Sequence, residues 1–298
     1  MGRRLSVRVP ATTANVGSGF DCLGIAFALH DELELELTED PTELSITVDG
    51  EGEGNVPLDE RHLVIQSLLT GLEAWGGRRP GLRLTCHNRI PHSRGLGSSA
   101  AAIVAGLAFA WGISRGQEPL DLPELTRISS RIEGHPDNAG AAVWGGAILA
   151  WFADDDVRLV NLDLHDSLGV RVWVPDFEVG TAGARSVLPA SVPRADAVTQ
   201  AIAAAALPLA LERRPDLIFA ATEDRLHQQY RAELMPQSWD LLRSLRAVGV
   251  PAAISGAGPA IFAVGSVEEL AAADACRADG FRRLEPAVGT GVELRVEG

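Results

Sequence analysis

The stretch Pro91-His-Ser-Arg-Gly-Leu-Gly-Ser-Ser-Ala-Ala102 decides the fold of this chain, because a glycine-rich turn runs directly into a small, apolar helix. Gly95 and Gly97 allow a sharp turn and a close approach to a ligand, and Ser98 and Ser99 are expected to cap the helix that follows. The first N–H groups of a helix have no partner within it, so they attract anions. The stretch therefore predicts a phosphate-binding loop.

Lysine is absent from this sequence, and all 26 basic residues are arginine. The Walker phosphate loop needs a lysine directly after its last glycine, so that loop is excluded. A Schiff-base lysine and a lysine clamp on a transferring phosphate are excluded for the same reason. Phosphate binding is therefore expected to use backbone N–H groups, hydroxyls, arginine and a metal ion.

Two other interpretations of the glycine loop remain open from the segment alone. One is a helix start with tightly packed glycines and no ligand. The other is a dinucleotide-binding fingerprint of the G-x-G-x-x-A type, which Gly95, Gly97 and Ala100 satisfy. That fingerprint directly follows the first strand of its domain, whereas polar residues 88–94 separate this loop from the preceding strand.

Length, charge and cysteine content set further limits. The 298 residues are 46% hydrophobic, which fits one large or two modest globular domains. The net charge of −14 opposes general binding to nucleic acid or anionic membrane. Cys22, Cys86 and Cys276 fit neither a disulfide framework nor a zinc site. The apolar runs 100–113 and 139–151 are shorter than a bilayer span, so a cytoplasmic address is expected.

Strand and helix patterns mix in both halves, which predicts an α+β fold. Residues 30–38 alternate leucine with glutamate, the pattern of a half-buried strand, and residues 44–48 are expected to pair with them. Residues 11–24 are expected to form a loop. The acidic run near residue 154 suggests two domains, residues 1–153 and 154–298. The other expected strands are 5–10, 82–87, 169–175, 252–255, 260–264 and 288–296, and the expected helices are 61–75, 98–111, 122–132, 196–211, 215–230, 239–248 and 267–278.

Two further glycine-bearing loops accompany the first. They are Pro10-Ala-Thr-Thr-Ala-Asn-Val-Gly-Ser-Gly-Phe-Asp21 and Ser255-Gly-Ala-Gly-Pro259. In this order and spacing, the three loops resemble the motifs of the GHMP kinases, the family of galactokinase, homoserine kinase, mevalonate kinase and phosphomevalonate kinase. The resemblance covers most of the chain. It implies a two-domain α+β fold with a ribosomal-S5-like N-terminal domain, a left-handed crossover, a ferredoxin-like C-terminal domain and a homodimer.

Four segments resemble the homoserine kinase branch of that family in particular. They are the Gly19-Phe-Asp21 end of the first motif, Glu133-Gly-His-Pro-Asp-Asn138, Thr181-Ala-Gly-Ala-Arg-Ser-Val-Leu-Pro189 and Asp224-Arg-Leu-His-Gln-Gln-Tyr-Arg231. The resemblance implies transfer of the ATP γ-phosphate to the hydroxyl of L-homoserine, a step toward threonine, with Mg²⁺ required.

The resemblance also implies which residues bind ATP and the metal. Ser98 or Ser99 would bind Mg²⁺ together with Glu133, whose alternative role is a solvated carboxylate that the helix dipole disfavours. His62 stands where the family usually has asparagine, so a preference for adenine over guanine is a hypothesis. The residues expected at the nucleotide are Pro91, Ser93, Arg94, Gly95, Leu96, Gly97, Ser98, Ser99 and Ala100 in the loop, His62 and Val64 beside the base, and Gly256 and Gly258 in the third loop.

A zwitterionic amino acid needs acceptors for its ammonium and cationic donors for its carboxylate. By the resemblance, Asn15, Asp21 and Asp137 would contact the ammonium and hydroxyl end, with His135 beside them. Arg185 and Arg231 would clamp the carboxylate with bidentate geometry. Without its flanking motif, either arginine would more often be expected to form a surface ion pair. The expected catalytic residues are Asn15, Asp21, Thr181 and Arg185.

The expected reaction has no dedicated general base. Asp21 or Asp137 could accept the alcohol proton, but a carboxylate that pairs with an ammonium is a weak base. The resemblance implies stabilisation of charge in the transition state instead, with the proton passing to phosphate. Three alternatives remain: a GHMP kinase for another small alcohol, a nucleotide- or amino-acid-binding protein without catalysis, and a dinucleotide-binding oxidoreductase.

Overall fold

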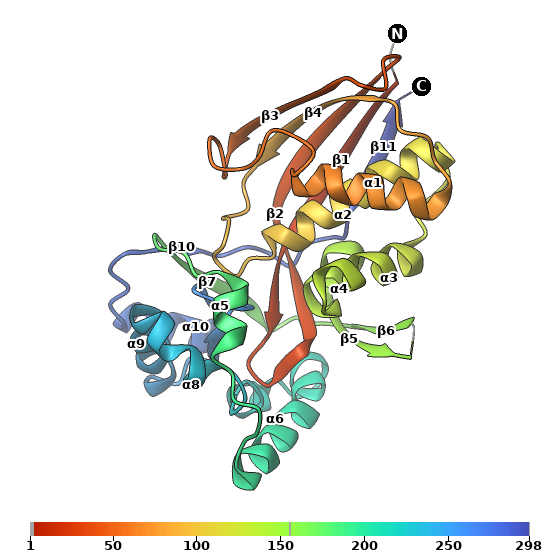
Figure 1. Cartoon of the computed structure of the whole chain (residues 1–298). Helices are drawn as coiled ribbons and strands as arrows, with labels where there is room; N and C mark the ends of the chain where they lie inside the picture. The colour runs from red at the N-terminus through yellow and green to blue at the C-terminus, as the bar shows by residue number, and fades with distance from the viewer. Residues whose placement is uncertain (1–2, 155, 298) are drawn as a thin grey trace.

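The computed structural model describes residues 3–154 and 156–297, which form two sheets with helices packed against each (Figure 1). The larger sheet has the order β11-β1-β2-β4-β3, with β5 added to β2 and β6 added to β5. Both ends of the chain lie at the same edge of this sheet, because β11 pairs with β1. Its strands are β1 (Arg4–Asn15), β2 (Gly19–Thr38), β3 (Leu44–Gly50), β4 (Gly81–Asn88), β5 (Ala147–Ala153), β6 (Asp156–Leu162) and β11 (Glu293–Glu297).

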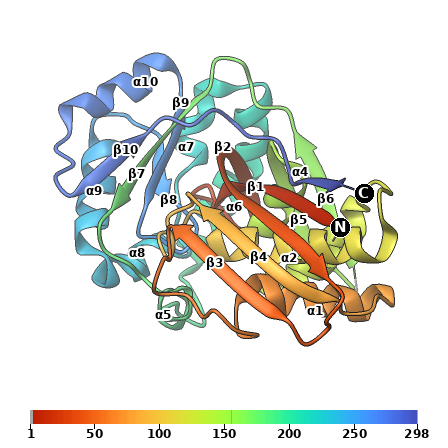
Figure 2. The same cartoon turned by 90° about the horizontal axis from the view of Figure 1, so that it is seen from above.

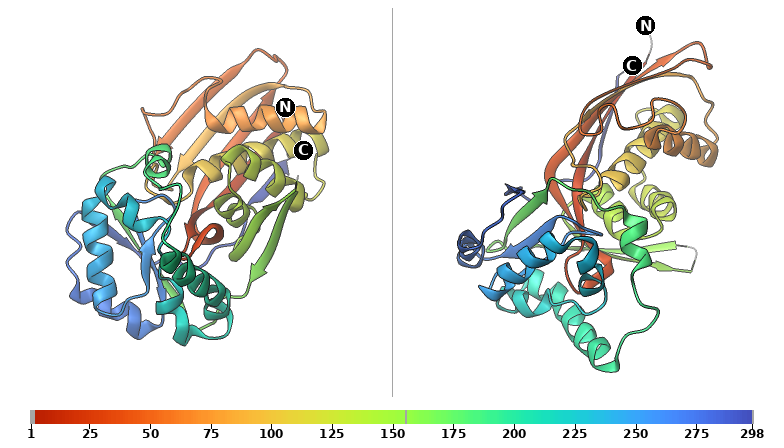
Figure 3. Two further views of the ribbon diagram at one scale, coloured as in Figure 1. Left: turned by 60° about the horizontal axis from the view of Figure 1, so that its bottom comes forward. Right: turned by 60° about the vertical axis from the view of Figure 1, so that its left-hand side comes forward.

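Helices cover one face of the larger sheet, as Figure 3 shows in its right-hand view. They are α1 (Leu63–Trp75), α2 (Ser98–Arg115), α3 (Leu122–Glu133) and α4 (Pro136–Trp144). Most of α2 is buried, including Phe109, and the strands contribute the fully buried Leu35 and Leu82 to the same core. Each fully buried side chain of this size contributes about 1.5–3 kcal/mol. The glycine loop is therefore anchored by a helix that cannot shift without opening the core.

The hairpin formed by β1 and β2 is longer than the sequence predicted. Figure 1 shows it running from the larger sheet down among the C-terminal elements. The prediction of a loop over residues 11–24 is wrong, because β1 continues to Asn15 and β2 begins at Gly19. Thr12 and Thr13 are fully buried, and their hydroxyls are satisfied by Asn138 and Ser255. The polarity of these threonines is typical of a loop, but here they lie in a buried strand.

Strand β4, not β3, lies next to β2. Residues 44–48 were expected to pair with residues 30–38, but β3 pairs in parallel with β4, and β4 pairs antiparallel with β2 (Figure 2). The inner position goes to the more apolar strand, since Leu82 and Leu84 are buried, whereas β3 is mostly exposed. Helix α1 connects this parallel pair, as a crossover must.

The smaller sheet confirms the ferredoxin-like expectation. Its strands are β7 (Gly169–Pro175), β8 (Ala252–Ile254), β9 (Ile261–Gly265) and β10 (Phe281–Leu284). The order is β10-β7-β9-β8, with every pair antiparallel. Helices follow β7 and β9, which gives the β-α-β-β-α-β arrangement of that fold. The main helices are α6 (Arg194–Glu212), α9 (Pro236–Ala247) and α10 (Val267–Ala272).

Two predicted elements of the C-terminal half take a different form. The motif at residues 181–189, which resembles a substrate-binding strand of the homoserine kinases, instead begins with the helix α5 (Thr181–Ser186). Residues 215–230 were expected as one helix but form a 3₁₀ turn, α7 (Ile218–Ala221) and α8 (Gln228–Arg231). The break occurs where the Asp224 carboxylate accepts three backbone N–H groups and so competes with the helix.

The predicted domain boundary after residue 153 falls inside a β-hairpin. Strand β6 pairs with β5 along its whole length, so it extends the larger sheet. A boundary between β6 and β7 keeps both sheets intact, and β11 then returns to the first domain. Asp154 and Asp156, two residues of the acidic run that suggested the boundary, lie exposed at the tip of the hairpin.

Candidate active site

The glycine loop has the geometry that its sequence predicted. Gly95 and Gly97 have φ values of 75° and 70°, in the left-handed region that favours glycine. A Cβ on Gly95 would collide with the carbonyl oxygen of Ser255, and a Cβ on Gly97 would collide with the hydroxyl of Thr12. Both glycines are therefore required by conformation and by space. The backbone here lies against the other two loops.

Ser98 and Ser99 do not cap the helix, contrary to the prediction. Gly97 is the N-cap residue, and α2 begins at Ser98. The two serines are the first helical residues, so their hydroxyls are free for other contacts. The Ser99 hydroxyl lies 3.1 Å from a carboxylate oxygen of Glu133, which ends α3.

Two cavities meet at this loop. The first has a volume of about 130 Å³ and lies between the two domains. The second has a volume of about 250 Å³, is mainly apolar and lies against α1 and the start of α2. Ser93, Ser98 and Ser99 line both. The predicted residues around the first cavity are Asn15, Asp21, Ser93, Gly95, Gly97, Ser98, Ser99, Glu133, His135, Asp137, Arg185, Arg231, Gly256 and Gly258, and those around the second are His62, Val64, Ser93, Ser98 and Ser99.

Three non-glycine residues around the first cavity have left-handed backbones. Asn15, Asp21 and Ser93 have φ values of 70°, 58° and 55°. Such conformations cost about 1–3 kcal/mol each and cluster at functional sites. The Asn15 amide accepts the Asp21 N–H and donates to the Gly256 carbonyl at 2.7 Å. Asn15 thus braces the first loop against the third and fixes where Asp21 points.

Asp21 and Arg185 form an ion pair at the mouth of the first cavity. The Arg185 guanidinium donates to both carboxylate oxygens, at 2.9 and 3.2 Å. Both side chains are partly exposed, at 36% and 46%. The two charges predicted to contact opposite ends of one ligand therefore contact each other.

Asp137 and His135 form the opposite wall. Asp137 is 1% exposed, and its carboxylate lies 2.7 Å from His135 Nδ1 and accepts the Asn138 N–H. Burial lowers the pKa of His135, but its hydrogen bond to Asp137 and the charges of Asp137 and Glu133 outweigh burial and raise it above the ordinary value. This wall is strongly anionic, as an ammonium group requires.

Arg231 is the buried cation of the site, at 2% exposure. Its Nε donates to the Ala184 carbonyl, and its Nη1 lies 3.0 Å from both the Gly256 carbonyl and His227 Nδ1. Burial, then the charge of Arg185, lowers the pKa of Arg231 to about 10, so it remains charged at neutral pH. The surface ion-pair reading fails for this arginine.

Some residues that were predicted to bind the nucleotide contact only protein groups in and around the glycine loop. Arg94 points away from the cavities and donates to the carbonyls of Pro175 and Asp176, so it is not placed to bind phosphate. Leu96, Pro91 and Ala100 are buried and contribute packing. The side chain of Thr181, a predicted catalytic residue, lies outside the described part of the chain.

Asp31 and Asn138 both support the glycine loop, and no role was predicted for either. Asp31 accepts the N–H groups of Arg89 and Ile90, where β4 leads into the loop, and burial raises its pKa to about 6. A signal was present, because Asp31 occupies the buried side of an alternating strand where an apolar residue is expected. Asn138 accepts a hydrogen bond from Thr12.

The dinucleotide-binding alternative does not survive the topology. A dinucleotide fingerprint lies in a β-α-β unit whose helix leads to a second parallel strand. Here α2 leads into α3, and residues 89–97 separate β4 from the helix. The fold and the site together define a kinase of the GHMP class. The family model described as the GHMP kinases N terminal domain matches residues 62–146, and the GHMP kinases C terminal model matches residues 206–280.

Within that class, the chain belongs to the homoserine kinase family. It is 48% identical over 296 residues to the homoserine kinase of Cutibacterium acnes, covering 99% of this chain and 100% of that protein. It is 47% identical to the homoserine kinase of Streptomyces avermitilis over 93% of this chain and 88% of that one. The crystal structure of homoserine kinase from Cytophaga hutchinsonii is 28% identical and matches 98% of this chain and 97% of that chain with a TM-score of 0.83.

Proposed function

We propose that this protein transfers the γ-phosphate of ATP to the hydroxyl of L-homoserine and releases O-phospho-L-homoserine, a step in threonine biosynthesis. The observation that carries the proposal is the charge arrangement of the first cavity. Beside the glycine loop lie one cation–anion pair, Arg185 and Asp21, and a second, buried cation, Arg231. This set complements a zwitterionic amino acid and no neutral sugar. The relatives named homoserine kinase support the same substrate, because homoserine is such an amino acid.

A zwitterion can exchange with the Asp21–Arg185 pair without leaving a charge unpaired. The substrate carboxylate takes the place of Asp21 on the guanidinium, and the substrate ammonium takes the place of Arg185 on Asp21. A ligand with a carboxylate alone would free Arg185 but leave Asp21 without a cation. Because both side chains are partly exposed, solvent screens part of the unpaired charge, and the cost is about 1 kcal/mol. The pair therefore favours amino acids over plain hydroxy acids.

The second cavity suits the base of ATP, with its phosphates on the glycine loop. His62 and Val64 line this cavity, and His62 Nδ1 is buried with no hydrogen-bond partner among the described residues. Burial, then the charge of His92, lowers the pKa of His62 and keeps its ring neutral. A neutral histidine with an unused nitrogen can replace the asparagine usual in the family as a partner for the base.

Glu133 and Ser99 fit a Mg²⁺ site. Burial raises the pKa of Glu133, and the only hydrogen bond to its carboxylate within the described residues comes from Ser99. The described residues hold no group of three or more acidic, histidine or cysteine side chains placed for a metal. Mg²⁺ needs none, because it binds through one or two protein oxygens, phosphate oxygens and water. When bound, the ion neutralises charge that develops on the transferring phosphate.

We assign no dedicated general base. Asp21 is paired with Arg185, and the Asp137 carboxylate accepts the Asn138 N–H and lies beside His135. Each carboxylate is thus engaged in binding. The alcohol proton then passes to the transferred phosphate, while the N–H groups at the start of α2 stabilise charge in the transition state.

The experiment that tests the proposal is ADP release from Mg-ATP with matched alcohols. L-Homoserine is compared with 4-hydroxybutanoate, which lacks the ammonium, 3-aminopropan-1-ol, which lacks the carboxylate, and mevalonate and galactose. We expect turnover with homoserine and at least about 100-fold lower kcat/KM with the two truncated analogues. Turnover with mevalonate or galactose would identify a different alcohol kinase. Binding of homoserine and ATP without ADP release would identify a protein that has lost catalysis.

We further propose that the protein is a cytoplasmic homodimer joined through α6. Two helices, α2 and α6, reach the length and mean hydropathy of a membrane span, but α2 belongs to the core. The outer face of α6 exposes Val198, Ile202 and Leu209, which share one side of the helix. An antiparallel pair of these helices would place the Arg194 end of one copy beside Glu212 of the second copy. Each end of α6 carries charges of both signs, Asp196 beside Arg194 and Arg213 beside Glu212, so the apolar side chains are the surface expected to hold the two copies together.

Light scattering tests the interface. Ile202→Asp should convert a dimer to a monomer, whereas Val267→Asp, at another exposed valine on α10, should leave the dimer intact. A monomeric wild type would overturn the dimer.

A further inference from the structure

His227 is fully buried directly behind the arginine that lines the first cavity. Its ring stacks on Phe20, with centroids 4.9 Å apart and the planes inclined by 16°. Phe20 precedes Asp21, and its ring also lies beneath the Arg231 guanidinium at 5.7 Å. The histidine therefore touches both the tip of the β1–β2 hairpin and the arginine of α8. It has no place in the reaction proposed above.

The hydrogen bonds of His227 fix its tautomer. Its Nε2 lies 3.2 Å from the Gly17 carbonyl oxygen, which can only accept, so Nε2 carries the proton. Its Nδ1 lies 3.0 Å from Nη1 of Arg231, which can only donate, so Nδ1 is bare. Burial lowers the pKa of His227 to about 4, which keeps the ring neutral. The neutral ring thus connects the two: it donates to Gly17 at the hairpin tip and accepts from Arg231.

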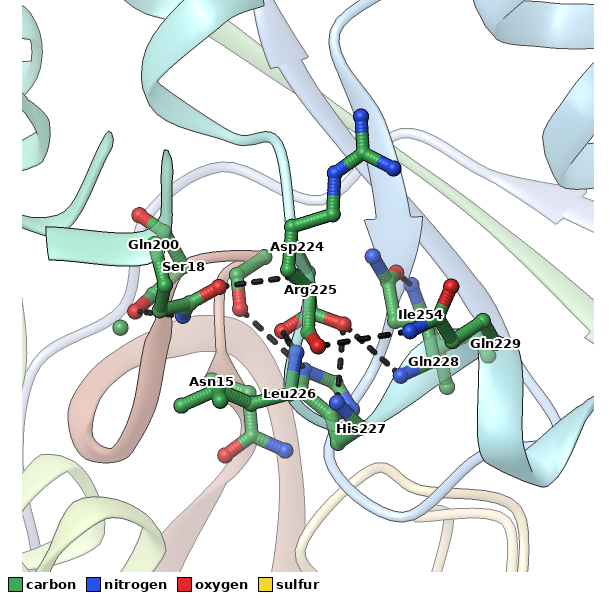
Figure 4. A network of polar contacts seen from close by, with 12 residues as sticks. Asn15, Ser18, Gln200, Asp224, Arg225, Leu226, His227, Gln228, Gln229 and Ile254 are labelled. Carbon is green, nitrogen blue, oxygen red and sulfur yellow. Dashed lines mark hydrogen bonds and ion pairs between the residues drawn. The ribbon is translucent and has the colours of Figure 1, made fainter. Parts of the chain in front are cut away.

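A buried turn presents His227 in this position, as Figure 4 shows. The Asp224 carboxylate accepts the N–H groups of Leu226, His227 and Gln228. The Gln228 side chain accepts the N–H of Ile254 on β8, which ties the turn to the smaller sheet. Gln200 joins the same turn to the hairpin, because it accepts the Arg225 N–H and donates to the Ser18 carbonyl.

Most of the N–H donors of Arg231 are already bonded to protein groups. A guanidinium has five N–H groups. The Nε group binds Ala184, and the two Nη1 groups bind His227 and Gly256. Nη2 has no protein partner among the described side chains and backbone, which leave out the side chains of residues 181 and 182, and Arg231 lines the first cavity. A bidentate fork needs two different nitrogens, so Arg231 cannot provide one.

We infer that His227 is a positioning residue that holds Arg231 so that only Nη2 faces the carboxylate of the amino-acid substrate. The inference rests on the proposed function. It corrects the expectation of two equivalent bidentate clamps, since the fork must come from Arg185 alone. It also couples the two halves of the amino-acid site, because the hairpin that carries Asn15 and Asp21 is bonded to Arg231 through one imidazole.

Two isosteric variants separate the two hydrogen bonds of His227. In His227→Asn, the amide oxygen can occupy the place of Nδ1 and still accept from Arg231, but the bond to Gly17 is lost. In His227→Gln, the amide nitrogen can reach the place of Nε2 and still donate to Gly17, but the acceptor for Arg231 is lost. Both variants lose one hydrogen bond, so both should lower Tm by a similar amount.

The kinetic readout is the KM for L-homoserine against the KM for ATP. We expect His227→Gln to raise the homoserine KM about 10- to 100-fold with the ATP KM unchanged, and His227→Asn to stay within about threefold of wild type. With 3-aminopropan-1-ol, which has no carboxylate, the three proteins should have equal kcat/KM. Equal losses in both variants, or an equal loss with 3-aminopropan-1-ol, would show that His227 acts only on stability.

A measurement on the wild type covers the case in which the variants do not fold. Nitrogen NMR of labelled histidine should show His227 as the neutral Nε2–H tautomer from pH 6 to 8. An imidazolium or an Nδ1–H tautomer in that range would overturn the inference. Failure of the proposed function is distinguishable, because it would appear as wild-type protein that does not phosphorylate homoserine while the tautomer is still present.

Discussion

The proposed nucleotide half of the site is built mainly from backbone, and the proposed amino-acid half is built from side chains. Residues 91–99 form one continuous segment whose glycines bring N–H groups to the surface of a cavity. The amino-acid half collects Asp21 from β2, Asp137 from α4, Arg185 from α5 and Arg231 from α8. The first half needs correct local conformation, while the second needs four separate elements to converge.

The two halves also differ in charge. Arg94, the arginine of the glycine loop, is turned toward the carbonyls of Pro175 and Asp176. The two arginines that line the first cavity, Arg185 and Arg231, lie on the amino-acid side. Formal positive charge is thus concentrated where the substrate carboxylate is expected, and phosphate is left to the N–H groups at the start of α2 and to the proposed Mg²⁺. The predictions below test this division, from the largest effect to the smallest.

Gly97→Ala should abolish use of ATP while leaving the amino-acid half intact. The new Cβ would collide with Thr12 and strain a left-handed residue, so we expect at least about a 100-fold loss in kcat/KM for ATP. The matched control is Gly76→Ala, which has φ of 69° but open space around it. It should lower Tm by a similar strain and keep full activity. Activity near wild type in Gly97→Ala would contradict a backbone-built phosphate site.

Arg185→Ala should damage only the amino-acid half. It removes the side chain that can form a fork with the carboxylate, so we expect the KM for homoserine to rise about 100-fold, with the KM for ATP unchanged. The control is Arg94→Ala, which should lower Tm through lost contacts with residues 175–178 and leave the homoserine KM alone. Steady-state kinetics with each substrate varied separately distinguishes the two arginines. A rise in the KM for ATP in Arg185→Ala would show that Arg185 also acts on nucleotide binding and would contradict the division into two halves.

Asp21→Asn should reduce the preference for a zwitterion. The variant removes the charge that homoserine's ammonium would neutralise, so discrimination against 4-hydroxybutanoate should shrink about tenfold, mainly through weaker use of homoserine. The measurement is the ratio of kcat/KM for the two alcohols. An unchanged ratio would mean that Asp21 does not contact the ammonium, and Asp137 would then be the next residue to test.

Stability should depend on pH through the amino-acid half. The pKa of His227 is about 6.5 when unfolded and about 4 when folded. Its contribution is fully present above pH 6.5 and is lost as the pH falls toward 4, with a slope of at most about 1.4 kcal/mol per pH unit. The charged groups that act on it are Asp224, Arg231 and Asp21. Urea unfolding of His227→Asn between pH 4 and 7 should lack this slope, and an equal slope would refute the assignment.

Much of the fold followed from local patterns. The helix ending at Gly134, the glycine loop opening α2 and the alternating strand of β2 were all predicted because each depends on residues close in sequence. Residues 11–24 were mistaken for a loop, because their burial comes from α4 and the third loop. The wrong partner predicted for β3 also reflects contacts between distant segments, since the inner place beside β2 goes to the more apolar strand, β4.

The site was predictable where a motif carried it. Glu133, Asp137 and Arg231 were named from short motifs and do line the cavity. The Asp21–Arg185 pair was not foreseen, because it joins residues far apart along the chain. The contact of His227 with Arg231 lies within one motif, but the direction of both side chains depends on partners elsewhere, Gly17 for His227 and Ala184 and Gly256 for Arg231. Arg94 was assigned to phosphate because it lies in the loop, yet its direction depends on carbonyls more than 80 residues away.

The sequence by itself determined the glycine loop, the kinase class and the absence of lysine chemistry, because glycine conformation and residue chemistry are local properties. Only the tertiary structure decided which charges meet. Asp21 and Arg185 are 164 residues apart in sequence and within hydrogen-bond distance in space. Arg231 is limited to one free nitrogen by Ala184 and Gly256 from distant segments and by His227 four residues before it. Charge pairing and donor count depend on distances of a few ångströms, which the packing of the two domains sets.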